Sequence, residues 1–423
     1  MPFATHYLTK HRIYDAFIPE PPLPDLRYTV VIPSYDEDRI TETLDSLWQA
    51  ESPRHAVEVI VVVNAPENGP PEVLESNRRT VEEIATWKNT HEDSRFVVHT
   101  IYVADLPAAK AGAGLARKIG MDEAVARYNR LDQPGGWIIS LDADTRVGNN
   151  YFQSIEQHIE TNPKLNAGVL YFEHPLEGEE FESGIYEAIV KYELFLRYYN
   201  QALRWAGYPY AFQTIGSAFC VKAEAYAKQG GMNTKRAGED FYFLNKVFQL
   251  GGVKDITDTA VYPSPRPSGR VLFGTGPEMI KWSDNNHRPY LTYYPDAFKT
   301  LKAFMELADR FYKASEEDQE SLLKKLDPVL RDFLASINFQ SELSRINNNC
   351  NSPAAYRKHF FHWFNGLRII RFIHIAQEQE YEKVPLNHAA QTLLRWRGDE
   401  PANDYPALLN QYREIERQNP RMI

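Results

Sequence analysis

Two aspartates separated by one residue offer the clearest chemistry in this sequence. Asp142 and Asp144 follow residues 137–141 (WIISL), an apolar run that is typical of a buried strand. Because side chains alternate along a strand, both carboxylates should point the same way at its carboxyl end. Two neighbouring carboxylates repel each other unless a positive charge lies beside them. A hard cation, Mg²⁺ or Mn²⁺, that also binds diphosphate oxygens would supply this charge. A solvated turn or a helix cap is the structural alternative.

The segments around this pair alternate between strand and helix patterns. Apolar runs predict strands at residues 28–33, 57–63, 96–103 and 137–141, and helical patterns predict helices at 38–50, 70–87 and 108–128. Weaker patterns favour strands at 168–172 and 218–222 and helices at 185–206 and 240–250. The alternation indicates a doubly wound α/β sheet, in which ligands bind outside the carboxyl ends of the strands. The two aspartates are therefore expected at a ligand-binding edge.

These patterns divide the chain into three parts. An irregular lead-in covers residues 1–26, the α/β domain covers 27–290, and a helical C-terminal region covers 291–423. An apolar stripe in the last part, at Leu323, Leu326, Leu330 and Phe333, should pack on the α/β domain.

Composition narrows the class of protein. The chain has 423 residues, of which 43% are hydrophobic and 25% charged, as in an ordinary globular protein of more than one domain. A net charge of −10 argues against nucleic acid as a partner. With two cysteines, no signal-peptide pattern and no run of 18 apolar residues, we expect a cytoplasmic protein without a transmembrane segment. Residues 359–376 are apolar with two arginines, which would permit peripheral membrane contact, although a core helix is the commoner case.

Two motifs together carry a resemblance to a known family. Residues 30–38 (VVIPSYDED) and 140–145 (SLDADT) resemble the nucleotide-sugar-binding core of family 2 glycosyltransferases, which have the GT-A fold. The resemblance covers residues 27–275 and includes several motifs in the family's order. It implies a mixed, Rossmann-like α/β sheet and a nucleotide-sugar donor. It also implies that Asp142 and Asp144 bind the complex of metal and diphosphate.

The same resemblance places the nucleoside near the first two strands. The turn from Pro33 to Glu37 would lie against it, with Tyr35 stacking on the base and Glu37 near the ribose. Asn64 stands at the end of the second strand, where the family usually has an aspartate, and an amide can still pair with a base edge. A UDP-sugar is the expected donor, although this departure leaves guanosine and other bases open.

Cationic and Gly-rich segments would contact the diphosphate. Residues 110–120 resemble the family's Gly-rich helix start, which implies phosphate contacts by backbone amides, Lys110 and Arg117. Close helix packing, with Arg117 in a structural ion pair, is the alternative. Arg266 and Arg270 lie in a Gly-rich segment, 266–276, that could close over the diphosphate as a lid or serve as a linker.

A candidate base lies further along the chain. Residues 238–241 (GEDF) resemble the Glu-Asp motif of inverting family members. This implies Asp240 as the base that takes the proton of the acceptor hydroxyl, and Glu239 as a group that binds acceptor hydroxyls. Acidic residues also favour the first turn of a helix, which is the structural alternative.

These features predict a metal-dependent hexosyltransferase that uses a nucleotide-sugar. Its acceptor would be a glycan, a lipid-linked sugar or a small molecule. The family's processive synthases carry membrane helices and a Gln-x-x-Arg-Trp motif, which this sequence lacks, so we expect single-addition transfer. The resemblance to the Glu-Asp motif implies an inverting mechanism. A retaining transferase and a sugar nucleotidyltransferase are the alternatives, and a non-catalytic sugar-binding protein is a third. Nucleotidyltransferases usually have a basic, Gly-rich signature after the first strand, where this chain has PSYDE.

Overall fold

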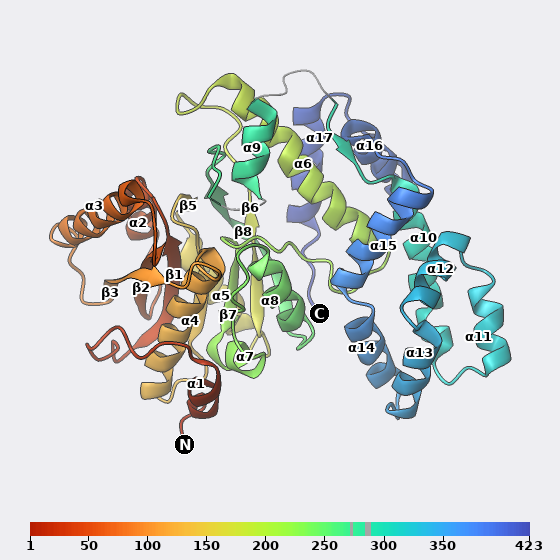
Figure 1. Ribbon diagram of the computed structural model, residues 1–423, viewed down its shortest axis with the longest axis horizontal. Coiled ribbons are helices and arrows are strands. Elements are labelled where there is room, and N and C mark those ends of the chain that lie inside the picture. The colour runs from red at the N-terminus through yellow and green to blue at the C-terminus, as the bar shows by residue number, and fades with distance from the viewer. Residues whose placement is uncertain (271–273, 284–288) are drawn as a thin grey trace. The chain divides into compact units, whose positions relative to one another are not determined.

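Two compact units make up the chain. The computed structural model describes residues 1–270, 274–283 and 289–423 (Figure 1). Unit 1 comprises Met1–Ile189, Gln213–Asn285 and Glu416–Ile423, and unit 2 comprises Val190–Phe212 and Asn286–Ile415. The chain crosses from one unit to the other within two helices, α6 (Ser183–Trp205) and α17 (Tyr405–Gln418). The division therefore differs in detail from a single boundary near residue 290.

An eight-stranded mixed sheet forms the centre of unit 1, in the order β3-β2-β1-β4-β7-β6-β8-β5. Its strands are β1 (Leu26–Ser34), β2 (Ala56–Pro66), β3 (Phe96–Leu106), β4 (Trp137–Ser140), β5 (Thr145–Val147), β6 (Ala167–Phe172), β7 (Phe219–Lys222) and β8 (Val253–Pro263). β1 to β4 are parallel, β7 is antiparallel to β4 and β6, and β6 is parallel to β8. The carboxyl ends of β1, β2, β4, β6 and β8 thus share one edge of the sheet. The predicted α/β class with a mixed sheet is confirmed.

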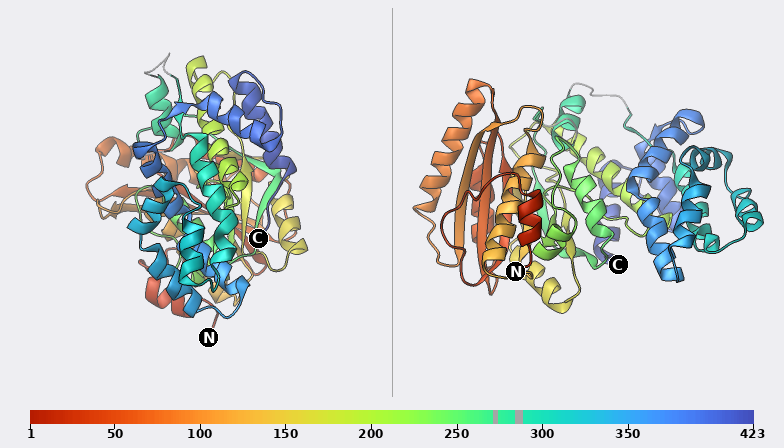
Figure 2. Two further views of the ribbon diagram at one scale, coloured as in Figure 1. Left: turned by 90° about the vertical axis from the view of Figure 1, so that its right-hand side faces the viewer. Right: turned by 60° about the horizontal axis from the view of Figure 1, so that its bottom comes forward.

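Helices cover both faces of the sheet. α3 packs on β2 and β3, whereas α4 packs on β1 and β2 from the other side (Figure 2). α4 approaches closely because Gly120 has no side chain; a Cβ there would lie 2.5 Å from Val31 Cγ1. The helices of unit 1 are α1 (Thr5–His11), α2 (Ile40–Gln49), α3 (Pro71–Lys88), α4 (Ala113–Arg130), α5 (Tyr151–Thr161), α7 (Ala223–Lys228), α8 (Glu239–Phe248) and α9 (Thr275–Ser283).

Both ends of the chain are fastened to unit 1. The lead-in that was expected to be irregular contains α1, and the Tyr7 hydroxyl donates to Asp122 Oδ1 of α4 over 2.6 Å. At the other end, the Val253 N–H donates to Ile423 O over 3.1 Å and the Ile423 N–H donates to Val253 O over 2.9 Å. The final residues therefore extend the sheet beside the first part of β8.

Unit 2 is helical apart from a two-stranded ribbon. Its elements are β9 (Leu291–Thr292), α10 (Pro295–Leu307), the 3₁₀ helix η1 (Ala308–Phe311), α11 (Glu316–Leu323), α12 (Pro328–Ser336), α13 (Phe339–Asn348), α14 (Pro353–Trp363), α15 (Gly366–Gln379), β10 (Val384–Pro385) and α16 (Leu386–Arg397). This arrangement confirms the expected helical C-terminal region.

The apolar side chains of α14 and α15 form much of the core of unit 2. Phe360, Phe364, Phe372 and Ile373 are at most 1% exposed. The stripe on α12 also packs within the unit, because the Phe333 ring contacts that of Phe372 at 5.5 Å. Core packing therefore accounts for the apolar character of residues 359–376. Within the described residues, no helix is long and apolar enough to cross a bilayer.

Candidate active site

Asp142 and Asp144 lie at the shared carboxyl edge of the sheet. β4 and Leu141 are buried, and the two aspartates that follow keep 38% and 29% of their side-chain exposure. Ala143 between them is buried, and its carbonyl accepts a hydrogen bond from Thr43 Oγ1 over 2.8 Å. The alternation predicted from the sequence therefore leaves both carboxylates partly buried and partly exposed at this edge.

Glu37, at the end of β1, joins this group through two arginines. Its Oε2 accepts from Arg266 Nη2 over 2.5 Å and from Arg270 Nη1 over 2.9 Å. Arg266 also reaches Asp38 Oδ1 at 2.9 Å and Asp144 Oδ2 at 3.4 Å. The segment after β8 thus lies over the ends of β1 and β4. Residues 271–273 of the segment considered as a lid lie outside the described residues.

The carboxylates outweigh the positive charge at Asp144. Burial, followed by the charges of Glu37 and Asp142, raises the pKa of Asp144 to about 6, although Arg266 and Arg270 oppose the shift. A hard cation would relieve this repulsion, and two carboxylates fit part of its oxygen shell. In the described part of the chain, no three His, Cys, Asp or Glu side chains form a complete metal site. The remaining ligands of such a cation would be water and substrate oxygens.

The turn after β1 is held from behind by two asparagines. Asp36 has a left-handed backbone with φ 50°, and its N–H donates to Asn77 Oδ1 over 2.9 Å. Asn77 Nδ2 donates to Asn64 O, and Asn64 Nδ2 donates to Ser34 O. Asn64 is only 1% exposed, so this structure places it under the turn. Of the residues predicted to contact the nucleoside, Pro33 is also buried, whereas Tyr35 is partly exposed.

Buried Arg117 contacts both Asp142, after β4, and Glu239, at the start of α8. Its guanidinium donates to Ser140 Oγ over 2.6 Å, to Gly216 O over 3.0 Å and to Asp142 Oδ1 over 2.9 Å, and it lies 3.4 Å from Glu239 Oε1. Burial alone would lower the pKa of Arg117, but the charges of Asp142, Glu239 and Asp240 raise it overall. Only 3% of the side chain is exposed. Arg117 therefore belongs to the site as a buried residue that holds the Asp142 and Glu239 carboxylates in place.

The Gly-rich start of α4 packs against Lys235 and Glu239, which precede the candidate base in the chain. A Cβ on Gly114 would lie 2.1 Å from the Lys235 carbonyl oxygen and 3.0 Å from Glu239 Cβ, so only glycine fits there. Lys110, which the sequence associated with the diphosphate, is exposed and precedes the helix. The helix starts at Ala113, later than residue 108, because Gly112 has a φ of 147° that few other residues adopt.

Asp240 begins α8 beside Arg117 and Asp142. Burial and the neighbouring charge of Glu239 raise the pKa of Asp240 to about 7, against the opposing charge of Arg117. Its Oδ1 accepts from the Phe241 N–H over 2.7 Å, and Oδ2 lies near Gly216. Glu239 is 5% exposed, and its Oε1 lies 3.4 Å from Arg117 Nη2. A partly exposed carboxyl with a pKa near neutrality is suited to accept a proton at physiological pH.

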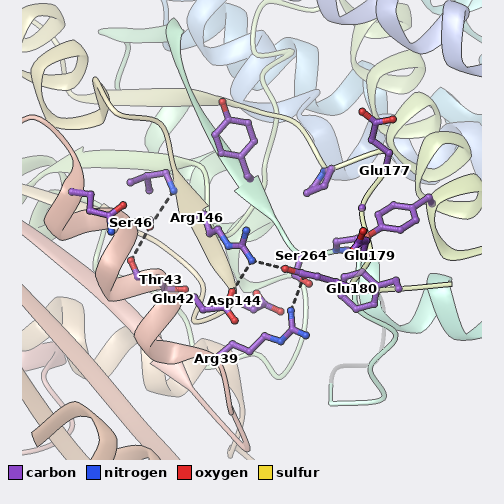
Figure 3. Close-up of a pocket in the computed structure, with 18 of the residues that line it drawn as sticks. Arg39, Glu42, Thr43, Ser46, Asp144, Arg146, Glu177, Glu179, Glu180 and Ser264 are labelled. Atoms are coloured by element: carbon purple, nitrogen blue, oxygen red, sulfur yellow. Dashed lines mark hydrogen bonds and ion pairs between the residues drawn. The ribbon is translucent and has the colours of Figure 1, made fainter. Parts of the chain in front are cut away.

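A pocket of about 580 Å³ lies beside Asp144 within unit 1 (Figure 3). Residues of α2, β5, the end of β8 and the loop after β6 line it: Arg39, Glu42, Thr43, Ser46, Gln49, Ala50, Asp144, Arg146, Val147, Asn149, Pro175, Glu177, Gly178, Glu179, Glu180, Phe181, Tyr186, Tyr262, Ser264 and Pro265. The sequence analysis missed this pocket, as it missed Asn77 and Ser140. The one available signal was the acidic stretch 177–180 (EGEE) directly after a predicted strand.

Comparisons with known proteins give distant structural similarities. No protein-family model and no curated protein matches the sequence. Among solved structures, residues 1–349 of TarS from S. aureus are 12% identical, with 84% of this chain and 92% of that chain covered and a TM-score of 0.40. The same part of TarS in complex with UDP-GlcNAc is 13% identical, with 92% and 90% covered and a TM-score of 0.40. The mannosyltransferase PcManGT from Pyrobaculum calidifontis, in complex with GDP-Man and Mn²⁺, is 16% identical, with 89% and 93% covered and a TM-score of 0.36.

Proposed function

We propose that this protein is a GT-A glycosyltransferase that transfers a hexosyl group from a nucleotide-sugar to an acceptor hydroxyl. One observation carries the proposal: Asp142, Asp144, Glu37 and two arginines gather at the carboxyl edge of the sheet, with Asp240 close by. Ligands of open α/β sheets bind at this edge. The group combines carboxylates, cations and a potential base, which are the elements that sugar transfer from a diphosphate requires.

Asp142 and Asp144 would hold a divalent cation, Mn²⁺ or Mg²⁺, together with the donor diphosphate. The raised pKa of Asp144 supports this role, because its carboxylate lacks sufficient positive charge in the protein itself. The bound cation would offset negative charge on the diphosphate as it leaves. Arg266 and Arg270 would bind diphosphate oxygens, since both are partly exposed and pair with Glu37, and Arg266 also lies 3.4 Å from Asp144. Tyr35 would flank the base, and UDP is the first nucleotide to test, followed by GDP.

Asp240 would act as the base of an inverting displacement. The acceptor oxygen forms a bond to the anomeric carbon, the bond from that carbon to the diphosphate oxygen breaks, and the acceptor proton passes to the Asp240 carboxylate. Arg117 would hold Asp142 and Glu239 in place without touching the substrate, because it is buried beneath both. Inversion of the anomeric configuration in the product would distinguish this mechanism from that of a retaining enzyme.

Nucleotide binding with and without metal tests the proposal. In thermal-shift and calorimetric titrations, Mn²⁺ should increase the affinity of the wild type for UDP or GDP. Asp144→Asn should lose this increase. Asp25→Asn is a matched control, because Asp25 is 63% exposed and precedes β1, at the opposite end of that strand. Wild-type protein that binds neither nucleotide, or an Asp144→Asn variant that keeps the full effect of Mn²⁺, would refute the proposal.

A further inference from the structure

The pocket beside Asp144 has the side chains of a carbohydrate site. The Ser46 hydroxyl, labelled in Figure 3, and the side-chain amides of Gln49 and Asn149 contribute to its lining. Such groups donate to and accept from the hydroxyls of a ligand. Thr43 also borders it, but its hydroxyl is buried and donates to Ala143 O. The volume of about 580 Å³ lies within the usual range of small-molecule sites, roughly 300–1,000 Å³.

Aromatic rings form another part of the wall. The Phe181 ring packs edge-to-face against the Tyr186 ring at 6.0 Å, and both residues line the pocket. Tyr186 is 8% exposed and supports the partly exposed Phe181 from below. Arg39 lies 5.6 Å from the centre of the Phe181 ring, which further fixes its position. A held ring of this kind offers a flat apolar face to one side of a sugar.

Away from Asp144, the charges of the pocket disfavour an anionic ligand. Both of its arginines are already paired: Arg39 with Glu180 at 2.8 Å, and Arg146 with Glu42 at 2.6 Å and Glu180 at 2.7 Å. The hydrogen bond from Arg146 lowers the pKa of Glu180, so the network stays ionised. A phosphate or carboxylate ligand would have to displace one of these carboxylates.

Two further carboxylates are available to a ligand. Among the residues that the structure describes, neither Glu177 nor Glu179 forms an ion pair, and both are exposed on the loop after β6. Ionised carboxylates accept hydrogen bonds from hydroxyls and repel negative charge. The pocket therefore favours a ligand that is rich in hydroxyls and carries no negative charge.

We infer that this pocket binds the acceptor, and that the acceptor is an uncharged glycan. The inference rests on the proposed function, because Asp144 borders the pocket and would also hold the donor diphosphate. The loops after β6 and β8 meet here at the ligand-binding edge of the sheet. A glycan segment in the pocket would extend from there toward the transferred sugar.

Uncharged and charged tetrasaccharides test this inference on the full chain. The uncharged probes are cellotetraose, mannotetraose and N-acetylchitotetraose, and the anionic probe is tetragalacturonate. Saturation-transfer NMR detects binding and calorimetry gives the Kd. We expect at least one uncharged probe to bind and tetragalacturonate to bind at least tenfold more weakly.

Variants of one loop locate the binding. Phe181→Ala and the double variant Glu177→Gln/Glu179→Gln should each weaken binding of the uncharged probe at least fivefold. Glu182→Gln is the matched control, because Glu182 is exposed on the same loop but does not line the pocket. UDP or GDP affinity should stay unchanged in all three variants.

Several outcomes would overturn the inference. The inference fails if no uncharged probe binds, or if tetragalacturonate binds more tightly than the uncharged probes. It also fails if the pocket variants bind the glycan as tightly as the wild type. Variants that weaken a nucleotide-sugar but not the free nucleotide would assign the pocket to the sugar of the donor instead. Glycan binding by a protein that binds no nucleotide would refute the proposed function while leaving the glycan site in place.

Discussion

Replacing Asp240 with asparagine separates the proton-accepting role of this residue from its contribution to stability. Asparagine keeps the size of the side chain and an oxygen that can accept from the Phe241 N–H, but it carries no charge. In the wild type, the pKa of Asp240 rises from 3.8 to about 7, because the carboxyl is partly buried and lies beside Glu239. Deprotonation of this carboxyl therefore costs the folded protein stability.

The coupling between protonation of Asp240 and folding fixes the sign and size of the stability change in Asp240→Asn. Below about pH 4 the carboxyl is protonated in both the folded and the unfolded chain, so the variant and wild type should be equally stable in this respect. As pH rises from about 4 to about 7, the wild type loses this stability, because the carboxyl ionises in the unfolded chain before it does so in the folded one; the asparagine variant has no such loss. The full shift corresponds to about 4 kcal/mol at roughly 1.4 kcal/mol per pKa unit. Solvent at the side chain reduces this, so we expect a stability gain of about 2 kcal/mol for Asp240→Asn at pH 8.

Urea unfolding at pH 5 and pH 8, combined with turnover, checks this expectation. The stability gain should be small at pH 5 and clear at pH 8, while turnover falls by about 10²–10⁴-fold and nucleotide affinity persists. Wild-type turnover should rise with pH to a plateau above about 7, where the base is ionised.

A second aspartate provides a control of opposite sign. A hydrogen bond from His158 lowers the pKa of Asp258 to about 2, so Asp258→Asn should destabilise the protein at both pH values. An Asp240→Asn variant with equal stability changes at pH 5 and pH 8 would show that the carboxyl titrates normally. Near wild-type turnover in that variant would show that Asp240 is not the base.

Three other changes test the structure around this residue. Arg117→Met leaves two carboxylates without their buried partner, and we expect a loss of about 3–5 kcal/mol in the free energy of unfolding; a loss below 1 kcal/mol would contradict this role of Arg117. Gly114→Ala should lower turnover at least tenfold with little change in nucleotide affinity, because the new methyl group must displace the Lys235 carbonyl and with it the turn before Asp240. Truncation after residue 290 should give insoluble protein, since it removes most of the unit that buries the second half of α6; soluble, folded product in gel filtration would refute this.

The sequence predicts best those elements whose signal is local. Continuous apolar runs located β1, β2 and β4, and the alternation of side chains placed both aspartates at the carboxyl edge of the sheet. β8 was missed because Lys254, Asp255 and Asp258 interrupt its apolar pattern. The Asp255 N–H donates to Arg421 O and its Oδ2 accepts from the Arg421 N–H. A partner 166 residues away gives no signal in the strand itself.

In the candidate site, too, contacts with distant segments leave no local signal in the sequence. Motifs singled out Arg117 and left a structural ion pair open as the alternative, but its partners Ser140, Gly216 and Glu239 come from three other segments and could not be named from the sequence. Asn64 has the right residue type for a base contact, yet it is buried under the turn, where its Nδ2 donates to Ser34 O and its carbonyl accepts from Asn77. Residue type identifies candidates, whereas access to solvent depends on which segments cover them.

The pairing of residues 421–423 with β8 affects the order in which the protein can fold during synthesis. Residues 416–423 belong to unit 1, but the ribosome releases them only after the whole of unit 2. Until then, the N–H groups of Val253 and Asp255 lack their partners from the last residues and expose an edge that another chain could pair with. A nascent chain arrested before residue 416 should therefore depend on chaperones, and emergence of residues 416–423 should end that dependence.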